Sequence, residues 1–567
     1  MTPPPLEVPV LVVGGGPVGL TLALDLAWRG IEVAVVERRA CDERPPAKCN
    51  HVSARSMEIF RRLGVAGKLR NAGLPADYPN DVAYRTTFTG RELSRITIPC
   101  RRDRYDATVG ADVGWPTPEP PHRINQIFLE PILGDHAHQA PRLTIVHRAD
   151  LHSAEERGDR VVAQVADLDS GRVAEVTCRY LVGCDGGTSL VRKLIGATFE
   201  GDAVLQRSQS TFLRAPDLLS RAAHPPAWAT FSLNPRRSGN VYAIDGRERF
   251  VVHNYLRDGE TFDGVDRDAS IRTILGVGPD FDYEILGTED WYGRRLIADR
   301  FRQGRMFLCG DAAHIWVPYA GYGMNAGIAD AATLAWQLAA HLAGWAPAAI
   351  LDAYDVERRP ITEQVSRYVM DHSHAMARQR REVPTNVEDD DAAGDAARHE
   401  LGRQAYELNV QQYCAAGLNF GSFIGASPLI VGDGEGAPPY TMATFTPSTV
   451  PGCRTPHVFL ADGTSLYDRL GPDYTLLRFD PTLDVGPLVA EGARQGLPLT
   501  VLDIGGNLGA DGPGVYASHP LVISRPDQHV AWRGSAVPAD AVRLVARLRG
   551  AARDETTEGE PSVPSVP

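Results

Sequence analysis

Three glycines near the amino terminus have the spacing of a turn that binds a pyrophosphate. The motif Gly14-x-Gly16-x-x-Gly19 follows the apolar run 10–13 and precedes residues 20–29, whose apolar side chains recur at helical spacing. In such a turn the first glycine permits the bend, the second lets the backbone approach a pyrophosphate, and the third lets the helix pack on the strand. The amino end of the helix then faces the anion. The pattern predicts dinucleotide binding.

An acidic residue stands where the ribose of that dinucleotide would lie. Residues 31–36 form a second apolar run, and Glu37 ends it. Residues 8–37 therefore read as a βαβ unit. A carboxylate at this distance accepts hydrogen bonds from the ribose hydroxyls and disfavours the 2′-phosphate of NADP. The residues alone leave FAD and NAD open as the bound dinucleotide.

Two more motifs follow apolar runs far along the chain. The first motif, at residues 184–192, has two interpretations. It is either a purely structural Asp-Gly turn followed by a Ser-capped helix, or part of a cofactor site. The second places a glycine-rich loop before a helix, where backbone N–H groups would face an electron-rich ligand such as the edge of a flavin ring. We interpret His314 as a loop histidine without a role in proton transfer. The motifs are Cys184-Asp185-Gly186-Gly187-x-Ser189-x-x-Arg192 and Gly310-Asp311-Ala312-Ala313-His314, continued by Pro318 and by Gly321-Tyr322-Gly323-Met324-Asn325.

The pattern of apolar residues predicts the elements that position these motifs. Polar and apolar residues alternate over 204–292, which indicates antiparallel strands inserted into an α/β domain. We expect a long helix at 326–342, a solvated loop at 381–400 and a small separate α/β domain after residue 446. The predicted parts are a discontinuous dinucleotide domain at 1–203 and 293–380, a substrate sheet at 204–292, a linker or helical segment at 381–445, an α/β domain at 446–550 and a disordered tail at 551–567.

Composition excludes several classes of protein. The chain has 567 residues with 71 acidic against 58 basic side chains, a net charge of −13, so a nucleic-acid binder is not expected. No apolar run reaches the roughly 20 residues that cross a bilayer, and no signal peptide is predicted. The eight cysteines form no CxxC pair, so we expect no zinc ribbon, no dithiol centre and no metal site. A cytoplasmic location is expected.

In this order and at these separations, the three motifs resemble those of the group A flavoprotein aromatic monooxygenases, the para-hydroxybenzoate and phenol hydroxylase family. The resemblance covers about residues 8–370. The family element Gln-x-x-x-Glu-x-x-Leu occurs as Gln126 to Leu133, with Arg123 just before it, and residues 354–360 match the end of the flavin domain. Lys48 stands where most members carry an arginine, and the run Lys48-Cys-Asn-His is similar to the chlorophenol-hydroxylase branch. Lysine keeps the charge but lacks the bidentate fork.

The resemblance implies FAD as cofactor, NADPH or NADH as a transient reductant, and O2. The fold it implies is a Rossmann-type FAD-binding domain with an inserted antiparallel substrate sheet. The residues it implies in FAD binding are Gly14, Gly16, Pro17, Val18, Gly19, Glu37, Arg38, Lys48, Arg123, Gln126, Asp185, Gly310, Asp311, Pro318, Gly321, Gly323, Met324 and Asn325. Pro318 is also expected at the reactive face of the flavin.

The implied reaction is hydroxylation of a phenolic or hydroxylated heteroaromatic ring through a C4a-hydroperoxyflavin. Two alternatives are epoxidation or Baeyer–Villiger oxidation of a polyketide-type substrate on the same scaffold, and a non-hydroxylating FAD-binding relative. The intact third motif favours an oxygenase over a dehydrogenase.

The resemblance also implies substrate contacts. An Arg-x-Tyr pair of the phenol hydroxylases aligns with His253-x-Tyr255, and their aspartate aligns with Asn50. We hypothesise that Tyr255 helps to deprotonate the substrate hydroxyl and that His253 tunes it; the alternative is that both are ordinary sheet residues. The expected substrate pocket consists of Trp228, Phe231, Tyr242 and Tyr255.

The carboxyl-terminal segment resembles the thioredoxin-like domain of phenol hydroxylases. The matching residues are Pro451-Gly452, Pro456-His457, Leu460, Asp462-Gly463, Ser465 to Asp468 and Arg525-Pro526-Asp527. Without a CxxC pair it cannot exchange disulfides. A packing or oligomerisation role is expected, in a homo-oligomer that is a dimer or larger.

Overall fold

The computed structural model describes residues 7–317, 321–509 and 514–552. Pro318 and the predicted disordered tail from residue 553 onward lie outside these residues. The chain divides into two compact units, which are described separately. Unit 1 contains residues 1–336, 358–422 and 438–446, and unit 2 contains residues 337–357, 423–437 and 447–567.

The predicted βαβ unit forms the centre of the first sheet of unit 1. Its strands are buried, and β1 pairs in parallel with β2 on one side and β8 on the other. Valine-rich runs suit this place, because both faces of a parallel sheet are covered. The sheet order is β14-β15-β8-β1-β2-β5, with β6 and β7 as an antiparallel extension of β8. The bounds are β1 (Glu7–Val13), β2 (Val33–Glu37), β5 (Leu143–His147), β6 (Ala149–Arg157), β7 (Arg160–Asp167), β8 (Val173–Gly183), β14 (Arg302–Gln303) and β15 (Met306–Leu308).

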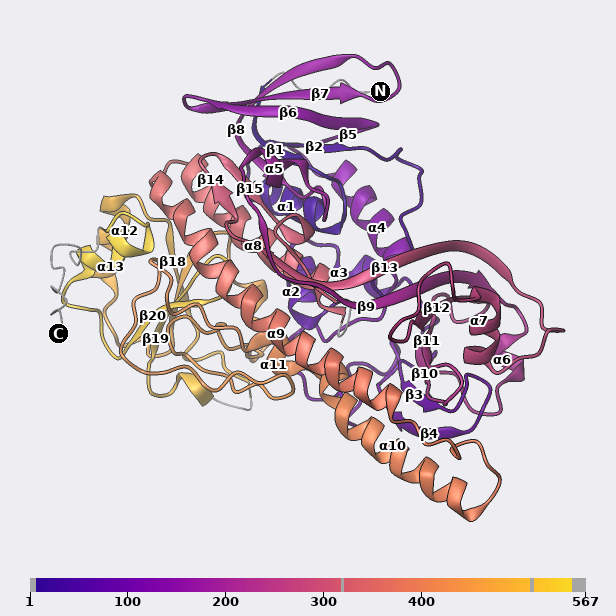
Figure 1. Cartoon of the computed structure of the whole chain (residues 1–567). Coiled ribbons are helices and arrows are strands. Elements are labelled where there is room, and N and C mark those ends of the chain that lie inside the picture. The colour runs from indigo at the N-terminus through magenta and orange to yellow at the C-terminus, as the bar shows by residue number, and fades with distance from the viewer. Residues whose placement is uncertain (1–6, 318–320, 510–513, 553–567) are drawn as a thin grey trace, which may run out of the picture. The chain divides into compact units, whose positions relative to one another are not determined.

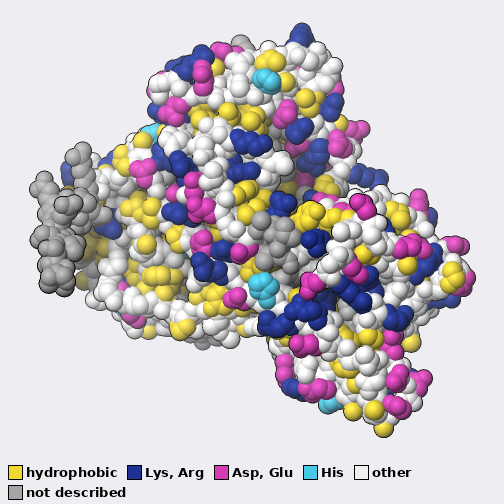
Figure 2. All heavy atoms as spheres, viewed as in Figure 1, with side chains coloured by type: hydrophobic (Ala, Val, Ile, Leu, Met, Phe, Trp, Pro, Cys, Tyr) yellow, Lys and Arg dark blue, Asp and Glu magenta, His cyan; other side chains and the backbone are white. Residues whose placement is uncertain are grey.

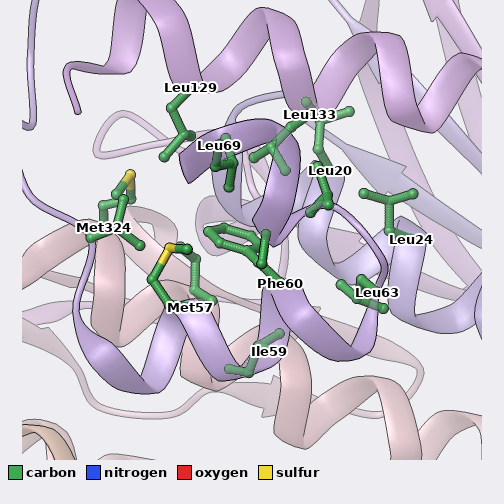
Figure 3. Packing of buried hydrophobic residues seen from close by; sticks show 14 of the residues in the cluster. Leu20, Leu24, Met57, Ile59, Phe60, Leu63, Leu69, Leu129, Leu133 and Met324 are labelled. Atoms are coloured by element: carbon green, nitrogen blue, oxygen red, sulfur yellow. The ribbon is translucent and has the colours of Figure 1, made fainter. Parts of the chain in front are cut away.

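A cluster of apolar side chains joins the helices beside this sheet. Phe60 lies at its centre, fully buried, with Met57, Leu69, Leu129 and Met324 around it (Figure 3). Burying a side chain of this size contributes about 1.5–3 kcal/mol. Since Met324 belongs to the third motif, the cluster fixes the start of the glycine-loop helix against its neighbours. The helices are α1 (Pro17–Trp28), α2 (Ala54–Arg62), α3 (Ala66–Arg70), α4 (Gln126–His138) and α8 (Gly323–Leu342).

The predicted antiparallel region forms the second sheet of unit 1. The long strands β9 and β13 pair along most of their length and run from the first sheet to the second (Figure 1). The sheet also contains β3 and β4, which the sequence analysis assigned to the dinucleotide domain. The order is β16-β13-β9-β12-β11-β10-β3-β4. The bounds are β3 (Val82–Arg85), β4 (Glu92–Ile96), β9 (Phe199–Arg214), β10 (Ala229–Ser232), β11 (Gly239–Ala243), β12 (Arg249–Tyr255), β13 (Glu284–Ala298) and β16 (His314–Ile315).

The predicted solvated loop at 381–400 is wrong from residue 392 onward, where helix α10 (Ala392–Tyr413) begins. The acidic run supplies the helix cap, because Asp391 accepts a hydrogen bond from the N–H of Gly394 at 2.7 Å. The helix packs against β4, and a Cβ on Gly402 would lie 2.1 Å from the carbonyl oxygen of Leu93. Only glycine allows this approach. The neighbouring helices are α9 (Ala353–Arg381) and α11 (Ala416–Phe420).

Unit 2 contains a four-stranded sheet in the order β18-β17-β19-β20. β17 and β18 are parallel and connected through α12, whereas β17, β19 and β20 pair antiparallel. The three strands that the sequence predicted here are present. Cys453 is the one cysteine of this unit. The bounds are β17 (Tyr474–Arg478), α12 (Gly486–Gln495), β18 (Leu499–Asp503), β19 (Leu521–Ser524), β20 (Val530–Gly534) and α13 (Ala541–Leu548). The thioredoxin-like assignment stays a prediction.

Short helices complete the structure, and surface charge is mixed. They are α5 (Leu190–Leu194), α6 (Leu218–Arg221), α7 (Arg267–Leu275), η1 (Gly310–Ala312), η3 (Ala348–Asp352), η4 (Leu466–Asp468) and η5 (Gly514–Tyr516). On the face in Figure 2, acidic side chains are scattered among the basic ones. Within the described ranges, no helix combines the length and the hydropathy that crossing a membrane requires.

Candidate active site

The glycine turn adopts the geometry that the motif predicts. Gly14 has φ +105°, and a Cβ there would lie 2.3 Å from the carbonyl oxygen of Cys184. A Cβ on Gly19 would lie 2.0 Å from the oxygen of Gly14, so helix α1 can pack this closely only with glycine. A Cβ on Gly16, by contrast, would meet nothing within 4 Å. The amino end of α1 is therefore open where a pyrophosphate would approach, and Pro17 occupies its first turn.

Glu37 lies at the carboxyl end of β2, with its carboxylate turned toward the glycine turn. One oxygen accepts a hydrogen bond from the Gly15 N–H at 2.6 Å, and the other from the Arg39 N–H at 2.9 Å. Burial opposes ionisation, but the hydrogen bonds and charge of Arg39 outweigh it and hold the pKa of Glu37 below its ordinary value. An ionised Glu37 suits a ribose with free hydroxyls. The predicted contact Arg38 is largely exposed beside Asp150.

The Gln-x-x-x-Glu element lies next to this carboxylate. Glu130 pairs with Arg39 at 2.5 Å, and Gln126 donates to Glu130 at 2.8 Å. Arg39 thus links Glu37 and Glu130. The element, 89 positions beyond Glu37 in sequence, is brought beside it because α4 precedes β5, which pairs with β2.

The second motif has a clear structural role and one unused acceptor. Asp185 Oδ2 accepts from the N–H groups of Leu190 and Val191 at the start of α5, at 2.7 and 3.2 Å. Arg192 donates to the carbonyl oxygen of Ala312 at 3.1 Å, which ties this motif to the third. The other oxygen of Asp185 is buried and has no hydrogen-bond partner among the described residues. That oxygen can accept a hydrogen bond from a ligand.

A buried network of charged side chains around Asp330 contacts the third motif. Asp330 accepts from His314 Nε2 at 2.6 Å and from Arg358 Nε at 2.7 Å, and the N–H of Gly310 lies 3.3 Å from the same carboxylate. Despite burial, the charges of His314 and Arg358 lower the pKa of Asp330 to about 2. His314, which lies in β16 rather than in a loop, therefore supports the third motif through Asp330, while Asp311 on η1 is exposed.

Asn325 joins the third motif to the segment around Lys48. Its Oδ1 accepts from the Ser53 N–H at 2.8 Å, and its Nδ2 donates to the oxygens of Gly321 at 2.6 Å and His51 at 3.1 Å. Gly321 has φ +61°, and a Cβ there would lie 3.0 Å from the Cβ of His51. Lys48 itself pairs with Glu289 of β13 at 2.7 Å.

Most of the residues predicted to contact substrate share one face of the second sheet. His253 and Tyr255 are two apart on β12 and so point the same way. Asn240 lies opposite His253 in the register, and Phe231 lies opposite Asn240. Tyr255 accepts a hydrogen bond from Asn240 Nδ2 at 2.8 Å. The structure therefore brings the pair together with most of the predicted lining residues.

Aromatic rings cover this face. The ring centroids of Trp228 and Tyr242 lie 5.3 Å apart, and Phe231 stacks on Tyr84 with 5.1 Å between the ring centroids. Tyr413, at the end of α10, contacts the Trp228 ring at 6.0 Å. Sequence analysis missed Tyr84 and Tyr413, because one lies in a strand assigned elsewhere and the other in the predicted linker. No local signal distinguishes either from a core aromatic.

Arg123 and Asn50 each contact a residue that the resemblance did not single out. The Arg123 guanidinium lies 4.4 Å above the Trp228 ring and contacts His51 Nδ1, so it belongs to the aromatic face. Its Nη2 is buried without a hydrogen-bond partner in the described part of the chain. Asn50 accepts from Asn125, the N-cap residue of α4, at 2.5 Å.

Residues 7–369 match the family described as FAD binding domain. The chain belongs to this family. FAD-dependent monooxygenase apdD of Emericella nidulans is 28% identical over 95% of this chain and 90% of its own length. A 4-methyl-5-nitrocatechol 5-monooxygenase of a Burkholderia species is 31% identical over 96% and 98%. The solved structure of RebC soaked with chromopyrrolic acid, with bound 7-carboxy-K252c, is 34% identical, covers 97% of this chain and 100% of its own, and has a TM-score of 0.86.

Family membership confirms the predicted flavoprotein monooxygenase and its Rossmann-type domain. The enzyme uses FAD, with NADPH or NADH as reductant and O2 as the second substrate. The open amino end of α1, the ionised Glu37 and the unused oxygen of Asp185 fit a dinucleotide with free ribose hydroxyls. Individual FAD contacts stay predictions.

Proposed function

We propose that this monooxygenase hydroxylates a phenolic or hydroxylated heteroaromatic ring. The supporting observation is a set of buried polar atoms on the aromatic face that lack partners among the described residues. They are Tyr84 Oη, Tyr413 Oη, Asn240 Oδ1 and Arg123 Nη2. A buried polar atom without a partner costs about 1–3 kcal/mol. A flat ring bearing oxygen substituents would stack on the aromatic side chains and satisfy these atoms together.

A chain of hydrogen bonds also determines which ring nitrogen of His253 carries its proton on this face. Trp291 Nε1 can only donate, so Ser210 Oγ accepts from it at 2.6 Å. The Ser210 hydroxyl is then left to donate to His253 Nδ1, also at 2.6 Å. Burial lowers the pKa of His253 to about 4, so its ring is neutral at pH 7. The remaining proton is on Nε2, from which His253 donates to a substrate oxygen.

Tyr255 completes this arrangement. Because its oxygen accepts from Asn240, its own proton is directed away from that amide. Tyr255 then donates a hydrogen bond to the substrate oxygen, and together with His253 it stabilises the phenolate that forms when the substrate hydroxyl releases its proton to solvent. A phenolate is far more reactive toward an electrophilic oxygen than the phenol. FAD supplies the activation of O2, and the buried aromatic side chains exclude water.

Product analysis tests this proposal. FAD-loaded protein is given NADPH, ¹⁸O₂ and a panel of phenols and hydroxylated heteroaromatics, with oxygen uptake and product mass recorded. Ring hydroxylation predicts substrate-stimulated oxygen uptake and one ¹⁸O atom in a new ring hydroxyl. An epoxide or an ester with inserted oxygen would support the alternative oxidations. No substrate-dependent oxygen uptake with any compound would support a non-hydroxylating protein.

Three further expectations belong to this proposal. We expect the enzyme to act in the cytoplasm as a homo-oligomer, and unit 2 to serve packing or assembly. With only Cys453 in unit 2, disulfide exchange between two cysteines of that unit is ruled out. Light scattering of the purified protein measures the oligomeric state, and a monomer would contradict the expectation.

A further inference from the structure

Three metal-ligating side chains from separate parts of the sequence meet at one edge of the first sheet. β2 and β5 are parallel neighbours, and Glu37 and His147 occupy matching positions at their carboxyl ends. Cys41 lies in the loop that follows β2, and His138 ends helix α4. One ligand atom from each of Cys41, His138 and His147 lies within 4.8 Å of the other two. A thiol and two imidazoles are the donor types that zinc prefers.

The hydrogen bonds of the two imidazoles determine which ring nitrogen of each is unprotonated and so able to bind a metal. His138 Nδ1 lies 2.7 Å from the oxygen of Gly134, and His147 Nδ1 lies 3.2 Å from the oxygen of Arg39. A carbonyl oxygen only accepts, so both Nδ1 atoms carry a proton. In the neutral rings the two Nε2 atoms then present lone pairs, yet they lie only 3.3 Å apart. Two lone pairs at this distance repel unless a proton or a cation lies between them.

The spacing suits a tetrahedral metal ion. Zn–N bonds of about 2.0–2.1 Å at a tetrahedral angle place two nitrogen atoms about 3.3–3.4 Å apart. The carbonyl groups of Gly134 and Arg39 are the outer partners that fix a ligating histidine in the Nε2-binding tautomer. The rings are parallel within 11°. His138 is exposed, so a rotation about its Cβ–Cγ bond can direct its lone pair at a shared ion.

We propose that Cys41, His138 and His147 bind a zinc ion, with water in the fourth position. On binding, the Cys41 thiol releases its proton to solvent and the thiolate forms the Zn–S bond. The ion would fasten the loop after β2 to the ends of α4 and β5. Arg39, whose carbonyl accepts from His147, also pairs with Glu37. The site would therefore stabilise the segment beside the predicted ribose position. This proposal is independent of the substrate that the enzyme oxidises.

Metal binding to the FAD-loaded, untagged protein tests the site. After treatment with a chelator and its removal, Zn²⁺ is titrated by calorimetry, and Co²⁺ is titrated in difference spectra against the flavin absorbance. We expect one equivalent of Zn²⁺ and a thiolate-to-Co²⁺ charge-transfer band. Cys41→Ser, His138→Gln and His147→Gln should each weaken Zn²⁺ binding at least about tenfold, and Cys41→Ser should abolish the band.

His152→Gln is the matched control, because His152 is an exposed histidine on the neighbouring strand β6. It should bind Zn²⁺ like the unaltered protein. Flavin content confirms that each variant is folded. If His147→Gln loses its flavin, the test uses Cys41→Ser instead, because Cys41 is exposed and its substitution should leave the fold intact. Zn²⁺ binding that is absent, or equal in Cys41→Ser and His152→Gln, would overturn the proposal.

Discussion

The side chain of Asn325 accepts a hydrogen bond from the backbone N–H of Ser53 at 2.8 Å, although the two residues are 272 positions apart. The same amide donates to the oxygens of Gly321 and His51. One buried side chain thus joins the glycine loop before α8 to the segment before α2. Both segments are implied in contacts with the flavin, so this amide fixes their separation.

Replacing Asn325 should therefore damage both stability and cofactor retention. Asn325→Ala leaves two buried backbone groups and one partly buried one without their partner, at about 1–3 kcal/mol for each buried group. We expect a lower free energy of unfolding and substantial loss of FAD during purification, measured by urea unfolding and flavin absorbance. Asn71→Ala, at an exposed asparagine bonded within its own turn, is the control. Equal flavin content in both variants would contradict the linking role.

Two glycines of the first motif should respond in opposite ways. Gly16 has φ −75° and room for a Cβ, so Gly16→Ala should fold with an unfolding free energy within about 0.5 kcal/mol of the original when FAD is absent. It should bind FAD at least about tenfold more weakly, because the methyl group fills the pyrophosphate position. Gly19→Ala should not fold stably, since its Cβ would overlap the Gly14 oxygen. Fluorescence titration with FAD separates these outcomes, and unchanged affinity in Gly16→Ala would exclude this pyrophosphate position.

Asp330 should be essential to the loop that carries the third motif. Asp330→Asn removes the carboxylate that pairs with the buried Arg358 guanidinium at 2.7 Å, and breaking a buried pair from one side costs about 3–5 kcal/mol. We expect a loss of this size in the free energy of unfolding, measured in urea at pH 7. Asp371→Asn, an exposed position on α9, should change it by less than about 0.5 kcal/mol. A loss below 1 kcal/mol in Asp330→Asn would show that the network is dispensable.

His253 should make stability depend on pH. Burial lowers its pKa from 6.5 to about 4, so the unfolded chain takes up this proton at higher pH than the folded protein. The contribution of neutral His253 to the free energy of unfolding is present above about pH 6.5 and is lost as the pH falls toward 4. The loss amounts to about 2 kcal/mol between pH 7 and pH 5. His253→Asn should lose that much less stability over this range. His399→Asn, at an exposed histidine on α10, should behave like the unaltered protein.

Tyr255→Phe tests the proposed hydrogen bond from Tyr255 to the substrate oxygen. It keeps the ring under Arg380, which lies 4.3 Å away, and removes only the hydroxyl. We expect product formation per NADPH oxidised to fall at least about tenfold, with FAD binding unchanged. Tyr292→Phe, at a half-exposed ring of β13, is the matched control. Equal rates and coupling in the two variants would make Tyr255 an ordinary sheet residue.

The sequence by itself determined the dinucleotide turn. Gly14, Gly16, Gly19 and Glu37 lie within one short βαβ unit, where each role follows from local sterics and the length of a single helix. The long helix after the third motif and the strands of unit 2 were also predictable, because apolar periodicity over one element reports which face is buried. The acidic run before α10 was misread, since a helix cap and a solvated loop have the same composition.

Only the tertiary structure decided which distant side chains meet. Tyr413 reaches the aromatic face from α10, and Arg123 lies over the Trp228 ring. Cys41 and His147 come together through the pairing of β2 with β5. Their spacing in the sequence matches no metal-binding motif, so the sequence did not predict this contact. Such contacts depend on sheet register and on the packing of helices far apart in the chain. Neither leaves a periodic or local signal, so the residues at both ends look like ordinary surface or core positions until the chain is folded.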